Sequence, residues 1–129
     1  MSDFEVPEAI ICSPFEEPAH YWHLEEGREP DKRDGRRPAV YYFPEQAVED
    51  AAAQGSTGTA IELKLVNLIR SRVKEWRAAG YPGVTATTLE LLSYWQRDGR
   101  GFRFFFAQIE AVETIVFLNE ARRDFLQGL

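Results

Sequence analysis

The chain has 129 residues, of which 44% are hydrophobic and 13% aromatic, so it carries enough apolar side chains for the core of one small domain. No run of eighteen apolar residues occurs, and the first residues are neither basic nor continuously apolar. We therefore expect a cytoplasmic protein without a secretion signal or contact with a membrane. The net charge of −6 argues against a surface that binds nucleic acid over its whole extent. The single cysteine, Cys12, is expected to be a packed free thiol.

The charge is unevenly distributed along the chain. Residues 1–50 hold thirteen acidic and five basic side chains, whereas residues 51–129 hold eight acidic and ten basic ones. Between Lys64 and Arg103, eight basic residues face three acidic ones. This segment is therefore where the chain would contact a phosphate backbone.

The N-terminal half has the pattern of an irregular arm followed by a short strand pair. Prolines interrupt the apolar residues of Phe4–Glu17, which allows extended pieces but no long helix. Gly27–Gly35 is highly charged and is expected to be an exposed loop or a wide hairpin tip. Ala39–Phe43 is β-branched and aromatic between two prolines, which predicts an edge strand, and Thr59–Leu63 is its expected partner.

Two helices are predicted at the start of the C-terminal half. Leu65–Ala79 has apolar residues at spacings of three and four, and Gly80 supplies a left-handed cap at its end. Thr87 and Glu90 have the spacing of a capping box, which predicts a shorter helix over Thr88–Gln96.

The stretch from Phe102 to Leu129 is predicted to form one helix of five or six turns. Its apolar residues define a stripe along one face, made by Phe105, Ile109, Val112 and Val116. Ile115–Leu118 makes one turn apolar all round, so this turn is expected to be buried on every side. Few residues remain to cover it, so we expect either a chain that continues past Leu129 or a homodimer through the 105–129 helix.

Together these elements predict an α+β fold in a single domain, expected to be an N-terminal fragment of a longer protein. Residues 1–63 form the irregular arm, the loops and the small antiparallel strand pair, and residues 64–129 form a three-helix unit. The strand pair and the arm are expected to pack on the helices.

Three stretches of the sequence resemble one family. Arg103–Leu118, with the sequence RFFFAQIEAVETIVFL, is similar to the segment just before the phosphate-binding loop of superfamily-two helicases of the DEAD/DEAH type. Specifically, it resembles the Res subunit of type III restriction-modification enzymes. Leu65–Thr85 and Pro14–Trp22 are similar to stretches of the same family's N-terminal region. The resemblance implies a position before the RecA-like core.

The resemblance also implies an activity for the parent protein. It would be an ATP-dependent DNA helicase or translocase and a restriction endonuclease, a hydrolase that works with ATP, magnesium, DNA and a modification-methylase subunit. In such helicases a glutamine pairs with the edge of adenine and an aromatic residue two positions earlier packs against the base; here these are Gln108 and Phe106. Without the resemblance, Gln108 would be expected to be a solvated residue on the polar side of the helix. The phosphate-binding signature Gly-x-x-x-x-Gly-Lys-Ser/Thr occurs nowhere in this chain, so we expect no catalytic residue and no bound cofactor in the chain alone.

Two groups of basic residues are candidates for contact with the DNA backbone. They are Arg70, Lys74 and Arg77 on one face of the first helix, and Arg97, Arg100 and Arg103 before the last helix. On their own, such residues most often form a solvated surface. The resemblance to a DNA translocase implies that they contact phosphates or a neighbouring domain.

Three further patterns admit other functions. Asp50, Glu62 and Lys64 match the spacing of a metal-dependent nuclease, but this pattern is permissive enough to occur by chance. His20 and His23 have glutamates nearby and could bind a metal, but the flanking aromatic residues favour a packed hook. A different class of function also fits, namely a self-contained interaction protein whose apolar C-terminal helix binds a partner or itself.

Overall fold

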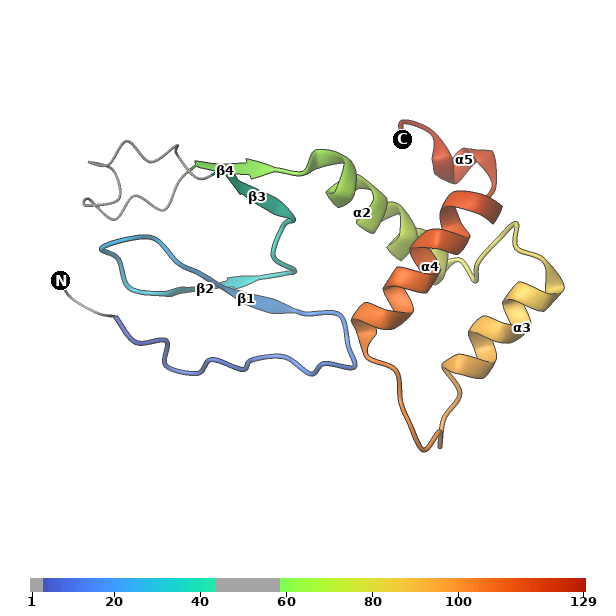
Figure 1. The fold of residues 1–129 in the computed structure, drawn as a ribbon, viewed down its shortest axis with the longest axis horizontal. Coiled ribbons are helices and arrows are strands. Elements are labelled where there is room, and N and C mark those ends of the chain that lie inside the picture. Colours follow the sequence, from blue (N-terminus) through green and yellow to red (C-terminus); the bar gives the residue numbers. More distant parts are fainter. Residues whose placement is uncertain (1–3, 44–58) are drawn as a thin grey trace. The chain divides into compact units, whose positions relative to one another are not determined.

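The structure is a computed structural model that describes residues 4–43 and 59–129 (Figure 1). In these residues it has two antiparallel strand pairs and four helices, so the predicted α+β class is confirmed. The chain forms two compact units. The first holds the described residues up to Cys12 and those from Pro18 to Lys64, and the second holds Ser13–Glu17 and Leu65–Leu129.

The first unit contains both strand pairs. β1 (His20–His23) pairs with β2 (Asp31–Asp34), and β3 (Val40–Phe43) pairs with β4 (Thr59–Glu62). The β3–β4 pair confirms the predicted pairing. The segment Gly27–Gly35, predicted as an exposed loop or a wide hairpin tip, contains β2, which is exposed. The strand itself was not predicted, because the Asp-Lys-Arg-Asp sequence of β2 has low strand propensity.

Hydrogen bonds from side chains to the backbone connect the segments of the first unit. Nε1 of Trp22 donates to the carbonyl oxygen of Glu8 at 2.7 Å, and Nη2 of Arg37 donates to the carbonyl oxygen of Trp22 at 2.7 Å. Within residues 4–12, 18–42 and 60–64 of this unit, no side chain is fully buried. Cys12 is exposed, so the expectation of a packed thiol is wrong, because the arm has no core of its own to enclose this side chain.

The helices of the chain are α2 (Lys64–Ala78), α3 (Ala86–Trp95), α4 (Phe106–Glu120) and α5 (Arg123–Leu126). α2 and α3 confirm the two helices predicted from the apolar spacing and the cap signal. The N-cap of α3 is Thr85, whose Oγ1 accepts a hydrogen bond from the Thr88 amide at 3.2 Å. The predicted cap, Thr87, lies instead inside the first turn, because the helix starts at Ala86.

The last stretch of the chain is not one helix as predicted. α4 ends at Glu120 because Ala121 has an extended backbone with a ψ of 149°. The turn that carries Gly83 packs against this break: a Cβ atom at Gly83 would lie 2.9 Å from the backbone nitrogen of Arg122, so the site requires glycine. Beyond the break, residues of α5 return to the core and cover part of its apolar surface; these are Phe125 and Leu126.

The apolar turn Ile115–Leu118 is buried on one side only. Phe117 is fully buried and Val116 packs against the core, whereas Ile115 is 66% exposed and Leu118 is 48% exposed. The prediction of burial on every side is therefore wrong. The break at Ala121 supplies the physical reason, since it directs the following residues towards the inner face of α4 and leaves the outer face open.

The core of the second unit is centred on Trp76. Val73, Trp76 and Phe117 are fully buried. The Trp76 ring meets the rings of Tyr81 and Phe117 edge-on, with centroid distances of 4.9 and 5.4 Å. Its Nε1 donates to the carbonyl oxygen of Pro82 at 3.0 Å. One side chain of α2 thereby positions both the connection to α3 and the inner face of α4.

Glu113 of α4 is a fully buried carboxylate beside this core. Arg77 of α2 donates two hydrogen bonds to it, from Nε at 2.7 Å and from Nη2 at 2.8 Å. The Tyr81 hydroxyl donates to the same carboxylate at 2.7 Å. The hydrogen bond to Glu113 raises the pKa of Arg77, and burial raises the pKa of Tyr81 to about 12, so the guanidinium stays charged and the phenol stays protonated at neutral pH.

Arg77→Met should strongly destabilise the fold, because the variant keeps the aliphatic contacts but removes both guanidinium hydrogen bonds from the buried Glu113 carboxylate. Breaking a buried ion pair costs about 3–5 kcal/mol, whereas an exposed pair contributes about 0.2–1 kcal/mol. Lys74→Met is the matched control, since Lys74 pairs with Glu17 at 3.3 Å with most of the lysine side chain exposed. Urea unfolding followed by circular dichroism measures both variants.

Adding Glu113→Leu to Arg77→Met removes the buried carboxyl group that has lost its guanidinium partner, so the double variant should recover part of the lost stability. If Arg77→Met and Lys74→Met cost the same free energy of unfolding, the buried pair does not have the role assigned to it.

Candidate nucleic-acid interface

The connection between α3 and α4 forms a pocket of about 260 Å³ on the second unit. Three of the predicted DNA-contacting residues lie in its wall: Arg97, Arg100 and Arg103. We call this feature the arginine pocket; its other lining residues are Trp95, Gln96, Asp98, Gly99, Phe104 and Ile109. Gly99 has a φ of 73°, which allows the connection to turn so that the three arginines line one space.

Two of the arginines stack on aromatic rings close in sequence. The guanidinium carbon of Arg97 lies 3.8 Å from the centre of the Tyr94 ring, and Nη1 donates to the Tyr94 carbonyl oxygen at 2.6 Å. The guanidinium carbon of Arg100 lies 4.3 Å from the centre of the Phe104 ring. Stacking orients each planar guanidinium and leaves further N–H groups on its edge for a ligand.

The third arginine stacks on a segment that is distant in sequence. The guanidinium carbon of Arg103 lies 4.7 Å from the centre of the Phe15 ring, and this ring packs against Phe105 with a centroid distance of 5.4 Å. The amide of Phe106, at the start of α4, donates to the carbonyl oxygen of Pro14 at 2.9 Å. The segment around Phe15 therefore holds both Arg103 and the beginning of α4.

The arginine pocket carries a positive charge that its own side chains do not neutralise. None of its three arginines forms an ion pair with a carboxylate in the described part of the chain. Asp98 also lines the pocket, so the charged side chains in the wall sum to +2. Guanidinium groups bind phosphate oxygens with parallel N–H groups. The pocket thus presents oriented donors suited to an oxyanion.

The structure separates the other three predicted basic residues from this pocket. Arg77 forms an ion pair with Glu113 at 2.7 Å, and its side chain is only 24% exposed. Lys74 pairs with Glu17, and Arg70 is half-buried on α2 with an interaction partner of its own. These residues lie on α2, and none of them lines the arginine pocket.

Gln108 lies in the first turn of α4 with an exposed side chain. Its Oε1 accepts a hydrogen bond from the Phe105 amide at 2.9 Å, which satisfies one of the free donors at the helix start. Its Nε2 has no hydrogen-bond partner among the described residues. Phe106 is half-buried, and the guanidinium carbon of Arg77 lies 5.5 Å from its ring centre.

The aromatic residues that orient the arginines of the pocket were not predicted from the sequence. The short separations between Tyr94 and Arg97 and between Arg100 and Phe104 are the signal that could have indicated two of them. No local signal exists for Phe15, because its contact with the pocket depends on the tertiary fold.

Gln96 was also missed as a site residue. Its Nε2 donates to the Tyr81 hydroxyl oxygen and to the Leu92 carbonyl oxygen, at 3.1 Å in both cases. Gln96 therefore links the wall of the arginine pocket to the buried carboxylate network.

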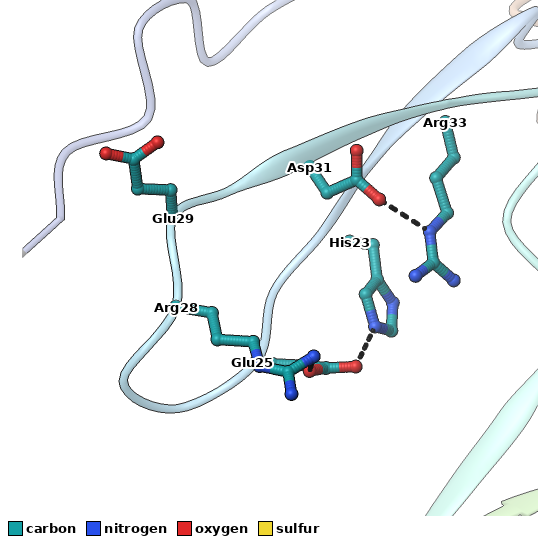
Figure 2. Close-up of a pocket in the computed structure, with 6 residues that line it drawn as sticks. All are labelled: His23, Glu25, Arg28, Glu29, Asp31 and Arg33. Atoms are coloured by element: carbon teal, nitrogen blue, oxygen red, sulfur yellow. Dashed lines mark hydrogen bonds and ion pairs between the residues drawn. The ribbon is translucent and has the colours of Figure 1, made fainter.

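A smaller pocket, of about 70 Å³, lies at the β1–β2 hairpin (Figure 2). Glu25 pairs with His23 and Arg28, each at 2.9 Å, and Asp31 pairs with Arg33 at 3.0 Å. The hydrogen bond to His23, together with the charge of Arg28, lowers the pKa of Glu25. These pairs satisfy both cations and two of the carboxylates within the hairpin, so the arginine pocket is the stronger candidate for an anionic ligand.

The two metal-dependent alternatives have different outcomes in the structure. Asp50 lies outside the described residues, so the structure does not test the nuclease pattern. His20 and His23 contact separate carboxylates, Asp34 at 3.0 Å and Glu25 at 2.9 Å. Within residues 4–43 and 59–129, no group of three or more histidine, cysteine, aspartate or glutamate residues is arranged to hold a metal ion.

No family model, no curated protein and no solved structure matches this chain. Across the helices that the structure describes, none has the length and apolar character needed to cross a membrane. The assignment of a function therefore depends on the arginine pocket, the start of α4 and the family resemblance.

Proposed function

We propose that this chain is the N-terminal part of an ATP-dependent DNA helicase or translocase similar to the Res subunit of type III restriction enzymes. In this proposal the arginine pocket binds the DNA backbone. The observation that carries it is the set of three aromatic-stacked arginines, without carboxylate partners, around one pocket. The domain contributes binding only, and a motor core in the parent protein would hydrolyse ATP and cooperate with a modification-methylase subunit.

Contacts to phosphates suit such an enzyme because a translocase must hold DNA of any sequence. Phosphate contacts give affinity and position without reading bases. The arginine pocket has this character, since its charged donors are guanidinium groups and its wall has no cluster of amide side chains directed at base edges.

Gln108 is the residue that we propose to contact the adenine of ATP in the parent enzyme. Its Nε2 would donate to a ring nitrogen, and the second lone pair of its Oε1 would accept from the exocyclic amine while the first still binds the Phe105 amide. Phe106 would lie next to the base. The residues at the start of α4 thus fit the base of the nucleotide, whereas phosphates and magnesium would be held by groups of the motor core.

The chain should bind DNA with an affinity that falls steeply with salt, and alanine at Arg97, Arg100 and Arg103 should weaken this binding. Each lost phosphate contact should reduce the slope of log affinity against log salt by about one. Fluorescence anisotropy with a labelled oligonucleotide over a range of salt measures the slope. Arg123→Ala is the control, because Arg123 is exposed and lies outside the pocket. A triple variant with the affinity and slope of the unmodified chain would contradict the proposal.

Gln108→Glu in the parent enzyme should reduce the preference for ATP over GTP while leaving the fold intact. The carboxylate can still accept from the Phe105 amide, but it lacks the N–H donor that adenine requires. Gln108→Ala loses both groups and should also lower the free energy of unfolding by about 0.5–1 kcal/mol. Steady-state ATPase and GTPase assays measure the preference, and an unchanged preference in Gln108→Glu would restrict Gln108 to its role at the helix start.

A second candidate function is self-association through the outer face of α4. Ala111, Ile115 and Leu118 are exposed at the four-three spacing of a coiled-coil seam, with Val112 beside them. The acidic residues of α4 are buried or half-buried, so its exposed face carries no charge. An uncharged apolar face is self-complementary, so a second copy of the chain would fit it.

Ile115→Glu should convert a dimer at high micromolar concentration into a folded monomer, because it places a charge in the seam without touching the core. Phe117→Glu serves as the contrast, since Phe117 is fully buried and this change should unfold the domain. Sedimentation velocity with circular dichroism separates the two effects. A monomeric unmodified chain at that concentration would rule out this function.

A further inference from the structure

Phe102 is 91% exposed, the highest exposure of any large apolar side chain among the described residues. It lies in the connection between α3 and α4, two positions after Arg100 and one before Arg103. The neighbouring phenylalanines all have partners: Phe104 stacks under Arg100, and Phe105 packs against Phe15. Phe102 makes no ring or cation–π contact with any described residue.

Phe102 does not line the arginine pocket, but it lies in the sequence between two of the arginines that do. An exposed aromatic ring beside a group of arginines combines the two features that recognise unpaired nucleic acid. Proteins that bind single strands join a positive groove for the backbone with aromatic rings on which bases stack. We therefore propose that the arginine pocket prefers single-stranded over duplex nucleic acid, and that Phe102 is the stacking platform for one unpaired base. This inference rests on the proposed function, since the arginines hold the backbone while Phe102 contacts the base.

The preference for an unpaired base follows from access to its face. In a duplex each base is covered on both faces by its neighbours, so Phe102 could reach one only after unstacking it. In a single strand the face is free, and stacking adds to the phosphate contacts without reading the sequence. A lone ring flanked by glycine and arginine also offers little continuous apolar surface to a protein partner.

The test uses the complete chain and three labelled probes of about 12 nucleotides: an oligothymidine strand, a duplex, and a strand with the same phosphates but abasic sugars. The unmodified chain should bind the oligothymidine about tenfold more tightly than the abasic strand, the usual contribution of one stacked base. Phe102→Ala should remove this difference and leave duplex binding unchanged, whereas Phe102→Trp should retain it. Tyr42→Ala is the matched control, since Tyr42 is an exposed aromatic residue in the other unit.

The two proposals fail in distinguishable ways. If the arginine variants weaken binding to every probe but Phe102→Ala binds the oligothymidine like the unmodified chain, the stacking inference is overturned and the phosphate site stands. If Phe102→Ala loses the preference for bases while the arginine variants bind normally, stacking is retained and the phosphate site is overturned. Equal affinity of the unmodified chain for the oligothymidine and abasic strands would also overturn the stacking inference.

Discussion

The buried carboxylate of Glu113 accepts hydrogen bonds from Arg77 and Tyr81, and these bonds fix three elements at once. Arg77 comes from α2, Tyr81 from the connection to α3, and Glu113 from α4. Tyr81 adopts a φ of 58°, which is unfavourable for a bulky residue, and its hydrogen bond and its packing on Trp76 offset that cost. A shift of any one element would leave a buried charge or donor unsatisfied, so the pair specifies one arrangement of the helices.

The same network supports the proposed binding site. Gln96 lines the arginine pocket and donates to the Tyr81 hydroxyl, so one wall of the pocket is hydrogen-bonded to the side chain that completes the Glu113 site. The pocket also depends on Phe15, because the Phe15 ring stacks with Arg103 and packs against Phe105. The arginine pocket is thereby connected both to the core, through Gln96, and to the segment around Phe15, through Arg103. Anchored arginines lose less side-chain entropy when they bind an anion.

α4 lacks the usual separation of polar and apolar residues onto the two faces of a surface helix. Its buried face contains a carboxylate, and its exposed face is apolar and uncharged, so hydrophobic and polar residues are not segregated as in an ordinary surface helix. The buried carboxylate is explained by Arg77, but the exposed apolar face has no counterpart in the second unit. The exposed apolar face of α4 is therefore the part of the second unit that a further copy or partner could cover.

Local patterns determined the elements whose side chains repeat regularly, and tertiary contacts decided the rest. The apolar spacing of Leu65–Ala79 is sufficient to predict α2, and the residues of β3 and β4 are sufficient to predict their pairing, because both signals are contained in a few adjacent residues. The charged strand β2 exists only through its pairing with β1. The end of α4 depends on the packing of Gly83 against Arg122, two residues that are far apart in the sequence.

From the sequence alone, six basic residues were equally good candidates for contact with DNA. Their charges and spacing were visible, but the partner of each was not. The tertiary structure puts Glu113 against Arg77 and gives Arg97, Arg100 and Arg103 aromatic rings without carboxylates. Whether an arginine supports the core or faces a ligand depends on which residues the fold brings within hydrogen-bond distance, and for Arg77 that partner comes from another helix.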